Sequence, residues 1–156
     1  MKTLWLTVVL ILGTVAQVFC QTAEVHLEKG HAFLTSNRAL QAESHYLQAL
    51  ELDSTSSEVH LRLGEIYLKR KHYPRAIIHY EAALGLQSNH PTTYIHLAFC
   101  QQQNGSIDKA IHTYLTLIEN HPELPEAYLG LGSLYDRQGL KQKAETAYAS
   151  YRELKH

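Results

Sequence analysis

The stretch that decides the fold is LRLGEIYLKRKHYPRAIIHYEAALGL, Leu61 to Leu86. Its long aliphatic residues and its single proline indicate two helices joined by a short turn. Yet small residues, Gly64, Ala76 and Ala83, stand where a helix pair normally places bulky side chains. A glycine inside a helix costs about 1 kcal/mol relative to alanine. We therefore expect another backbone to come very close to this glycine, and we expect the pattern to recur wherever that approach recurs.

The pattern recurs every 34 residues without a gap. The recurring sets are Gly30, Gly64, Ala98 and Gly132; Phe33, Tyr67, Gln101 and Tyr135; Ala42, Ala76, Ala110 and Ala144; and Tyr46, Tyr80, Tyr114 and Tyr148. They divide the chain into units 23–56, 57–90, 91–124 and 125–156. A fixed period of this length is the signature of a stacked repeat protein. Each unit is predicted to hold two helices, here called helix A and helix B.

The spacing of these small and aromatic residues resembles the tetratricopeptide repeat family, and the resemblance covers 23–156. It implies an all-α fold, a right-handed solenoid of helix-turn-helix repeats, in which the A helices line a concave groove that binds a peptide or a helix. Some positions depart from the family pattern. The fourth residue of the units is never tryptophan, and the third unit has Ala98 and Gln101 where glycine and an aromatic residue are usual.

Prolines and turn residues fit the same division. Pro74 is expected in the first turn of a helix B, where its missing N–H costs least. Three other prolines, Pro91, Pro122 and Pro125, are expected in the connections between units. The turns between helices A and B carry Asn37, Lys71, Gly105 and Gly139, of which the two glycines suit a left-handed backbone.

Residues 1–20, MKTLWLTVVLILGTVAQVFC, lie outside the repeats. One lysine precedes an apolar run that is shorter than the roughly 20 residues that span a bilayer. This arrangement predicts a signal peptide, with cleavage after Cys20 or after Ala16, and hence an exported protein, periplasmic or secreted. The alternative is an uncleaved anchor formed by residues 4–19. Removal of Cys20 would leave Cys100 as the only thiol, which we expect to be a small buried apolar residue.

In the last unit the positions that would receive a following repeat are polar, namely Lys141, Glu145 and Arg152. Terminal repeats require such a polar outer face for solubility. We therefore expect the stack of repeats to end with this unit.

The candidate partner-binding residues lie on the A helices, roughly opposite the packed face at 100° per residue. They are Leu27, His31, Leu61, Glu65, Leu68, Ile95, Phe99, Gln102, Leu129 and Arg137. Phe99 is expected at the apolar centre of this groove, because the equivalent residues of the other units are polar. The aliphatic residue at the fifth position of each unit has an alternative role in packing between repeats. Leu27 and His31 occupy the places of the lysine and asparagine that clamp a C-terminal carboxylate in some family members, so that clamp is absent.

The sequence lacks the residues that nucleic-acid binding, catalysis or metal binding would require. The formal net charge is −1 and there is no basic tract, so nucleic-acid binding is not expected. No catalytic constellation, phosphate loop or metal-ligand spacing is found, and neither an enzyme nor a cofactor is predicted. His45 and His79, equivalent in adjacent units, are expected to be neighbours on the solvated face of the B helices.

Two functions remain. The first is an exported scaffold, monomeric or weakly self-associating, that binds a protein or peptide partner. The second is a structural subunit of an envelope or membrane assembly, in contact with the membrane only if the N-terminal segment is retained.

Overall fold

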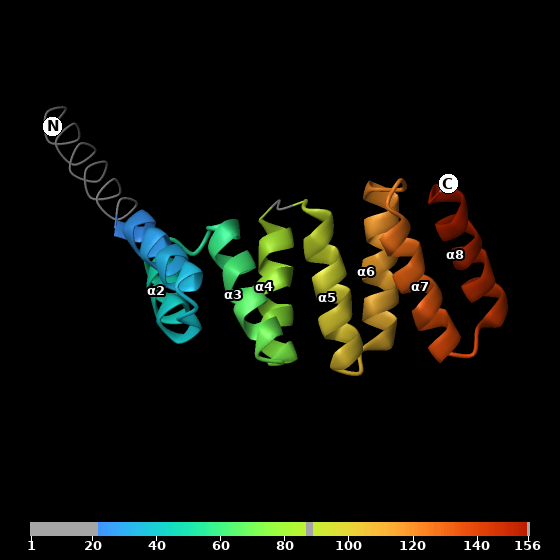
Figure 1. The fold of residues 1–156 in the computed structure, drawn as a ribbon, viewed down its shortest axis with the longest axis horizontal. Coiled ribbons are helices and arrows are strands. Elements are labelled where there is room, and N and C mark those ends of the chain that lie inside the picture. Colours follow the sequence, from blue (N-terminus) through green and yellow to red (C-terminus); the bar gives the residue numbers. More distant parts are fainter. Residues whose placement is uncertain (1–21, 87–88, 156) are drawn as a thin grey trace, which may run out of the picture.

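The computed structural model describes residues 22–86 and 89–155, and in these ranges every regular element is a helix (Figure 1). Residues 22–35 form the first helix. The others are α2 (Ala39–Leu52), α3 (Ser57–Lys69), α4 (Tyr73–Gly85), α5 (Pro91–Gln103), α6 (Ile107–Asn120), α7 (Pro125–Arg137) and α8 (Lys141–Leu154). Helices adjacent in the chain pack against each other, and the pairs follow one another along the long axis of the molecule. The predicted all-α solenoid is confirmed. The predicted signal peptide lies outside the described residues.

The helix starts follow local sequence signals. Ser56 caps α3, because its hydroxyl accepts a hydrogen bond from the backbone N–H of Val59 at 3.4 Å. Pro74 lies in the first turn of α4, as predicted. Pro91 and Pro125, however, are the first residues of α5 and α7 rather than parts of the connections. Proline is favoured at this first position because its fixed φ suits the helix and its N–H has no partner there.

All four turns between helices A and B contain one residue in the left-handed region. Gly105 and Gly139 have φ of 80° and 74°, as their residue type suggested. Asn37 and Lys71 adopt the same conformation, with φ of 57° and 59°. Because lysine rarely adopts a positive φ, the closely similar turn geometry indicates that the packing of the two helices imposes it.

The close approach at Gly64 comes from a side chain and not, as expected, from another backbone. A Cβ atom added to Gly64 would lie 2.7 Å from Cε1 of Tyr80, which is shorter than any normal contact. The Tyr80 ring is therefore laid flat against the backbone of the neighbouring helix. The same arrangement joins Gly30 to Tyr46 and Gly132 to Tyr148. The first, second and fourth repeats thus share one glycine–tyrosine contact, whereas Tyr114 of the third repeat lies against Gly130 of the fourth.

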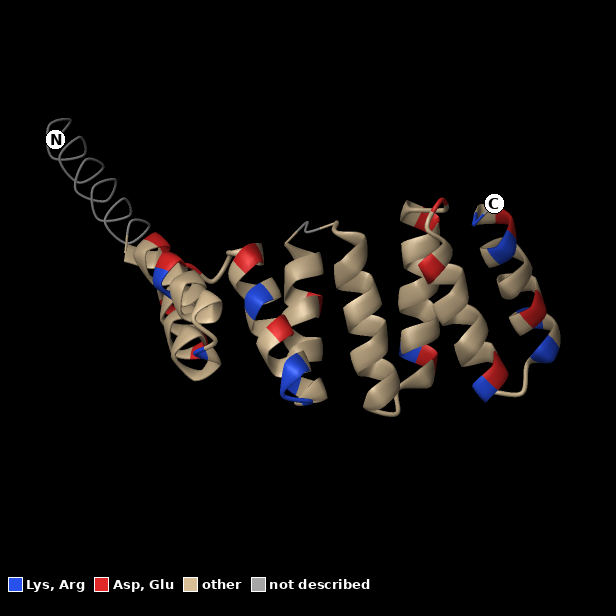
Figure 2. Ribbon diagram, viewed as in Figure 1, with Lys and Arg blue, Asp and Glu red and all other residues tan. Residues whose placement is uncertain are grey.

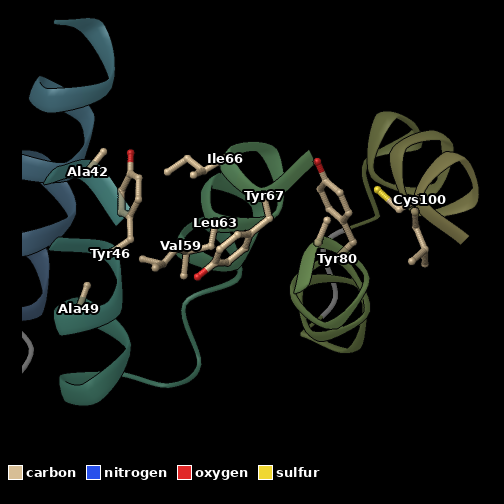
Figure 3. Packing of buried hydrophobic residues seen from close by; sticks show 11 residues of the cluster. Ala42, Tyr46, Ala49, Val59, Leu63, Ile66, Tyr67, Tyr80 and Cys100 are labelled. Atoms are coloured by element: carbon tan, nitrogen blue, oxygen red, sulfur yellow. The ribbon is translucent and has the colours of Figure 1, made fainter. Parts of the chain in front are cut away.

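The buried residues form two clusters along the array. The first includes Tyr46, Leu63 and Tyr80, all at most 1% exposed (Figure 3). The second surrounds Ala110, Leu117 and Leu134 in the C-terminal half. In the third repeat Gln101 replaces an aromatic residue and remains buried, because its Oε1 accepts a hydrogen bond from Oγ1 of Thr113 at 2.8 Å. In the last repeat Lys141, Glu145 and Arg152 are exposed, as the polar outer face predicted.

Cys100 is fully buried, and burial raises the pKa of its thiol to about 11. A protonated, inaccessible thiol is a poor nucleophile. Among the described residues no group of three or more histidine, cysteine, aspartate or glutamate side chains is arranged to hold a metal ion.

We therefore predict that neither a reductant nor a chelator changes the thermal stability of residues 21–156. Differential scanning calorimetry in 1 mM EDTA, in 5 mM dithiothreitol and in buffer alone would test this. A fall in Tm of several degrees in either additive would reveal an intermolecular disulfide or a metal site.

Candidate functional site

A pocket of about 760 Å³ opens between the A helices α3 and α5. α3 contributes Ser57, Glu58, Leu61, Arg62 and Glu65; α5 contributes Thr92, Thr93 and His96; Tyr80, Asn89 and His90 complete the lining. The Tyr80 hydroxyl, from α4, lies 3.4 Å from Nδ1 of His96. The pocket therefore offers hydroxyl, imidazole and carboxylate groups beside one aliphatic side chain, that of Leu61, and its lining is mostly polar.

An ion-pair ladder fixes the α3 wall of the pocket. The guanidinium of Arg62 lies 3.4 Å from a carboxylate oxygen of Glu58 and 3.3 Å from one of Glu65, one turn away on either side. Burial by itself lowers the pKa of Arg62, but the two carboxylates outweigh it and hold the pKa above its ordinary value. Arg62 thus stays charged and restrains both glutamates.

α5, by contrast, carries no Asp, Glu, Lys or Arg, as Figure 2 shows, and His96 is its only titratable side chain apart from Tyr94 and Cys100. Charged residues lie on α3, on one side of it, and on α7, on the other. The centre of this face therefore presents hydroxyl, amide and aromatic groups between two charged flanks.

The structure brings two of the sequence-predicted site residues, Leu61 and Glu65, into this pocket. His31 is not a lining residue, but its Nε2 lies 3.4 Å from Oε1 of Glu58, which is one. Gln102 is half-buried near the end of α5, and Arg137 is exposed at the end of α7. These last two residues are not part of the pocket lining.

The predicted aliphatic residues divide into two groups. Leu27, Leu61, Leu68 and Ile95 are half-buried and pack against the two core clusters. The packing of Leu27, Leu61 and Ile95 supports the alternative role that the sequence left open for the fifth position. Leu129, also at the fifth position, is 43% exposed.

Phe99 is the exposed aromatic residue of α5, at 41%. Its ring meets the edge of the Tyr73 ring, with centroids 6.2 Å apart. It lies about two turns along α5 from the pocket lining at Thr92 and is not itself a lining residue. Phe99 therefore belongs to the same face of the array as the pocket without being its centre.

Several lining residues were missed from the sequence. Arg62 and His96 occupy the sixth position of their units, one residue beyond the predicted set, and Tyr80 was expected only at the helix seam. The sixth position was omitted because the ideal helix projection places it at the edge of the groove face. A signal did exist, since Glu58, Arg62 and Glu65 have the spacing of an ion-pair ladder along one helix face.

His45 and His79 have different partners from those predicted. Each contacts a histidine of its own repeat, His26 and His60 respectively, and not the other. All four rings are half-buried at the seam between helices A and B, rather than on a solvated face.

The structure repeats a helix pair of constant length, with small residues and tyrosines at the seams and a pocket between A helices. These features define the class of helical repeat proteins that present a surface to partners. The chain belongs to the tetratricopeptide repeat family, whose model matches residues 27–91 and 101–155. The search of curated proteins found no match.

Solved structures with the same fold include MamA, at 24% identity and a TM-score of 0.80, covering 92% of this chain and 84% of the other. MamA from Desulfovibrio magneticus RS-1 is 20% identical with a TM-score of 0.76, over 85% of this chain and 75% of that one. A tetratricopeptide repeat protein from Parabacteroides merdae is 25% identical with a TM-score of 0.79, over 86% of this chain and 54% of its own length.

Proposed function

We propose that this chain is an exported scaffold that binds a peptide or helix of a partner protein along its A helices. The observation that carries the proposal is the pocket of about 760 Å³ between α3 and α5, which holds Leu61 beside hydroxyl, imidazole and carboxylate groups. Exposed Phe99 and Leu129 extend the same face toward α7. An amphipathic segment would place apolar side chains on these residues and polar ones against Glu65 and His96.

Apart from the imidazoles of His90 and His96, the titratable groups that line the pocket are poorly suited to acid–base chemistry, which favours binding. Its acidic residues are tied to Arg62, and its tyrosine is held protonated, because burial raises the pKa of Tyr80 well above the ordinary value. A general base needs a pKa near the working pH. Recognition by shape and hydrogen bonding is the function these residues support.

Binding should depend on two residues of this face. We predict that Phe99→Ala weakens capture of a partner by about 2 kcal/mol, roughly 30-fold, the scale of an interface hot spot. Thr92→Tyr should weaken it at least 10-fold, because the new ring would fill the pocket that the exposed Thr92 lines.

The measurement would use dodecamer peptides selected by display against the wild-type chain, titrated by fluorescence anisotropy. Glu81→Tyr is the matched control, because Glu81 is exposed on α4 and absent from the pocket lining. Equal binding by wild type, Phe99→Ala and Thr92→Tyr would show that partners dock elsewhere.

Export is proposed from residues 1–20, whose lysine, short apolar run and less apolar tail favour a cleaved signal. Among the described residues no helix is long and apolar enough to cross a membrane. We predict a mature N-terminus at or near Gln21 in protein from its native host, determined by Edman sequencing. An intact Met1 in the membrane fraction would instead support the tethered structural subunit.

A further inference from the structure

Two histidine pairs occupy equivalent places at the helix seams of the first two repeats. In the first, Nδ1 of His26 lies 3.1 Å from Nδ1 of His45. In the second, Nδ1 of His60 lies 3.0 Å from Nδ1 of His79. Each pair joins helix A to helix B of one repeat, and the ring centroids are 5.3 Å apart in both. The two pairs are 34 residues apart, so the contact recurs at equivalent positions of two repeats and does not depend on one isolated side chain.

An aromatic ring covers each pair. Phe33 stacks on His45 with an interplanar angle of 8°, and Tyr67 stacks on His79 with an angle of 16°. Their centroids are 5.2 Å and 5.4 Å from those of the histidine rings. The stacked rings cover one face of the His45 and His79 imidazoles, and the exclusion of water there strengthens the electrostatic interactions at each pair.

The short N–N distance requires one ring to donate its Nδ1–H and the other, which must be neutral, to accept it. A neutral imidazole offers one N–H and one lone pair, so two neutral rings can form this hydrogen bond. When both rings are protonated, each offers only donors and carries a positive charge. The bond that joins the two helices then becomes a repulsion, about 3 Å across, inside a partly desolvated seam.

The surrounding charges do not neutralise that repulsion. Burial, then His60, then Arg75 lower the pKa of His79 to about 4, and Glu43 of α2 only partly opposes them. Glu43 is itself engaged by the Tyr67 hydroxyl and by Arg70. At the first pair, burial, His26 and Lys29 lower the pKa of His45, opposed by a hydrogen bond to Gln48.

The last two repeats have no histidine pair at the equivalent positions, and they therefore serve as an internal comparison. The equivalent residues are Tyr94 and Thr113 in the third repeat, and Tyr128 and Ala147 in the fourth. Thr113 hydrogen-bonds to Gln101 instead, and neither residue pair gains a charge below pH 7.

We propose that the histidine pairs make the seams of the first two repeats acid-sensitive: in mildly acidic surroundings the population in which helix A has separated from helix B rises there, whereas the last two repeats do not respond. α3 supplies one wall of the pocket, so opening of the second seam removes that wall.

The direction follows from proton linkage. His79 has a lower pKa in the folded state, about 4, than the ordinary value of 6.5 that it regains when the seam opens. The open state therefore binds more protons between these two values, and stability of the seam is lost as the pH falls from about 6.5 toward 4. For His79 alone, the opening constant should rise roughly 20-fold between pH 7 and pH 5. Most carboxylates remain ionised at pH 5, so their titration contributes little.

Amide hydrogen exchange, measured at pH 7 and at pH 5 on residues 21–156, would test the proposal. After correction for the intrinsic pH dependence of exchange, protected amides of α3 and α4 should show the roughly 20-fold increase in opening. Amides of α7 and α8 should change less than threefold. A rise of equal size in all four helices would overturn the proposal, because it would indicate general acid destabilisation.

The matched variant is His60→Tyr/His79→Thr, which gives the second repeat the residues of the third. Its α3 and α4 amides should lose the acid response and behave like those of α7 and α8. His79→Gln is the second variant, because glutamine keeps a hydrogen-bonding group and cannot take up a proton in this range. Retention of the full acid response in both variants would overturn the proposal.

Discussion

Replacing Tyr80 by alanine is expected to lower the free energy of unfolding by about 3–5 kcal/mol. The ring is 1% exposed and fills the seam between α3 and α4, where it lies on the backbone of Gly64. Its removal leaves a cavity against a glycine, which has no side chain to move into the space. Urea denaturation followed by circular dichroism would measure the change.

Phe99→Ala is the control for this measurement, because Phe99 is 41% exposed and lies on α5, outside the seam between α3 and α4. It should cost less than about 1 kcal/mol, within the range of surface substitutions with some packing loss. A loss for Phe99→Ala as large as that for Tyr80→Ala would place Phe99 in the core and remove it from the binding surface. A loss below about 1.5 kcal/mol for Tyr80→Ala would mean that neighbouring repeats close the cavity.

Replacing Gly64 by valine should cost about 2–3 kcal/mol, toward the upper end of overpacking penalties. The added Cβ would lie 2.7 Å from Cε1 of Tyr80 and 2.8 Å from Cδ1, and the buried ring has no free space into which to move. The helix must therefore shift away from its partner. Valine is the better helix former of the two, so a loss of stability cannot come from intrinsic propensity.

Gly85→Ala is the matched control for Gly64, because nothing lies within 4 Å of a Cβ at this last residue of α4. It should raise stability by about 0.5–1 kcal/mol through helix propensity. The double variant Gly64→Val/Tyr80→Ala should be less destabilised than the sum of the single changes, because the cavity accepts the valine. Strict additivity in this cycle would show that the two residues do not press on each other.

The sequence could show that the recurring small and aromatic residues belong together. It could not show which atoms of the two residues touch. The period identified Gly64 and Tyr80 as members of one pattern. It did not show that the tyrosine ring itself occupies the space of the missing Cβ, because that depends on the rotamer which the packed seam selects.

The candidate binding surface was predicted less completely than the fold. A helix projection placed Leu61 and Glu65 on the correct face, where they line the pocket. It did not distinguish Leu129, which is exposed, from Ile95, which packs against the core. The two occupy equivalent positions, and their difference arises from the neighbouring repeats that cover one and not the other.

The sequence by itself determined the number, length and order of the helices, because a 34-residue period of small and aromatic residues is compatible with one way of stacking helix pairs. Local chemistry also determined the glycine turns and the position of Pro74 in the first turn of α4. Only the tertiary structure decided the left-handed turn at Lys71 and the partners of His45 and His79. The physical reason is that these features depend on the distance and rotation between packed helices, which bring together residues 19 positions apart and which no single helix specifies.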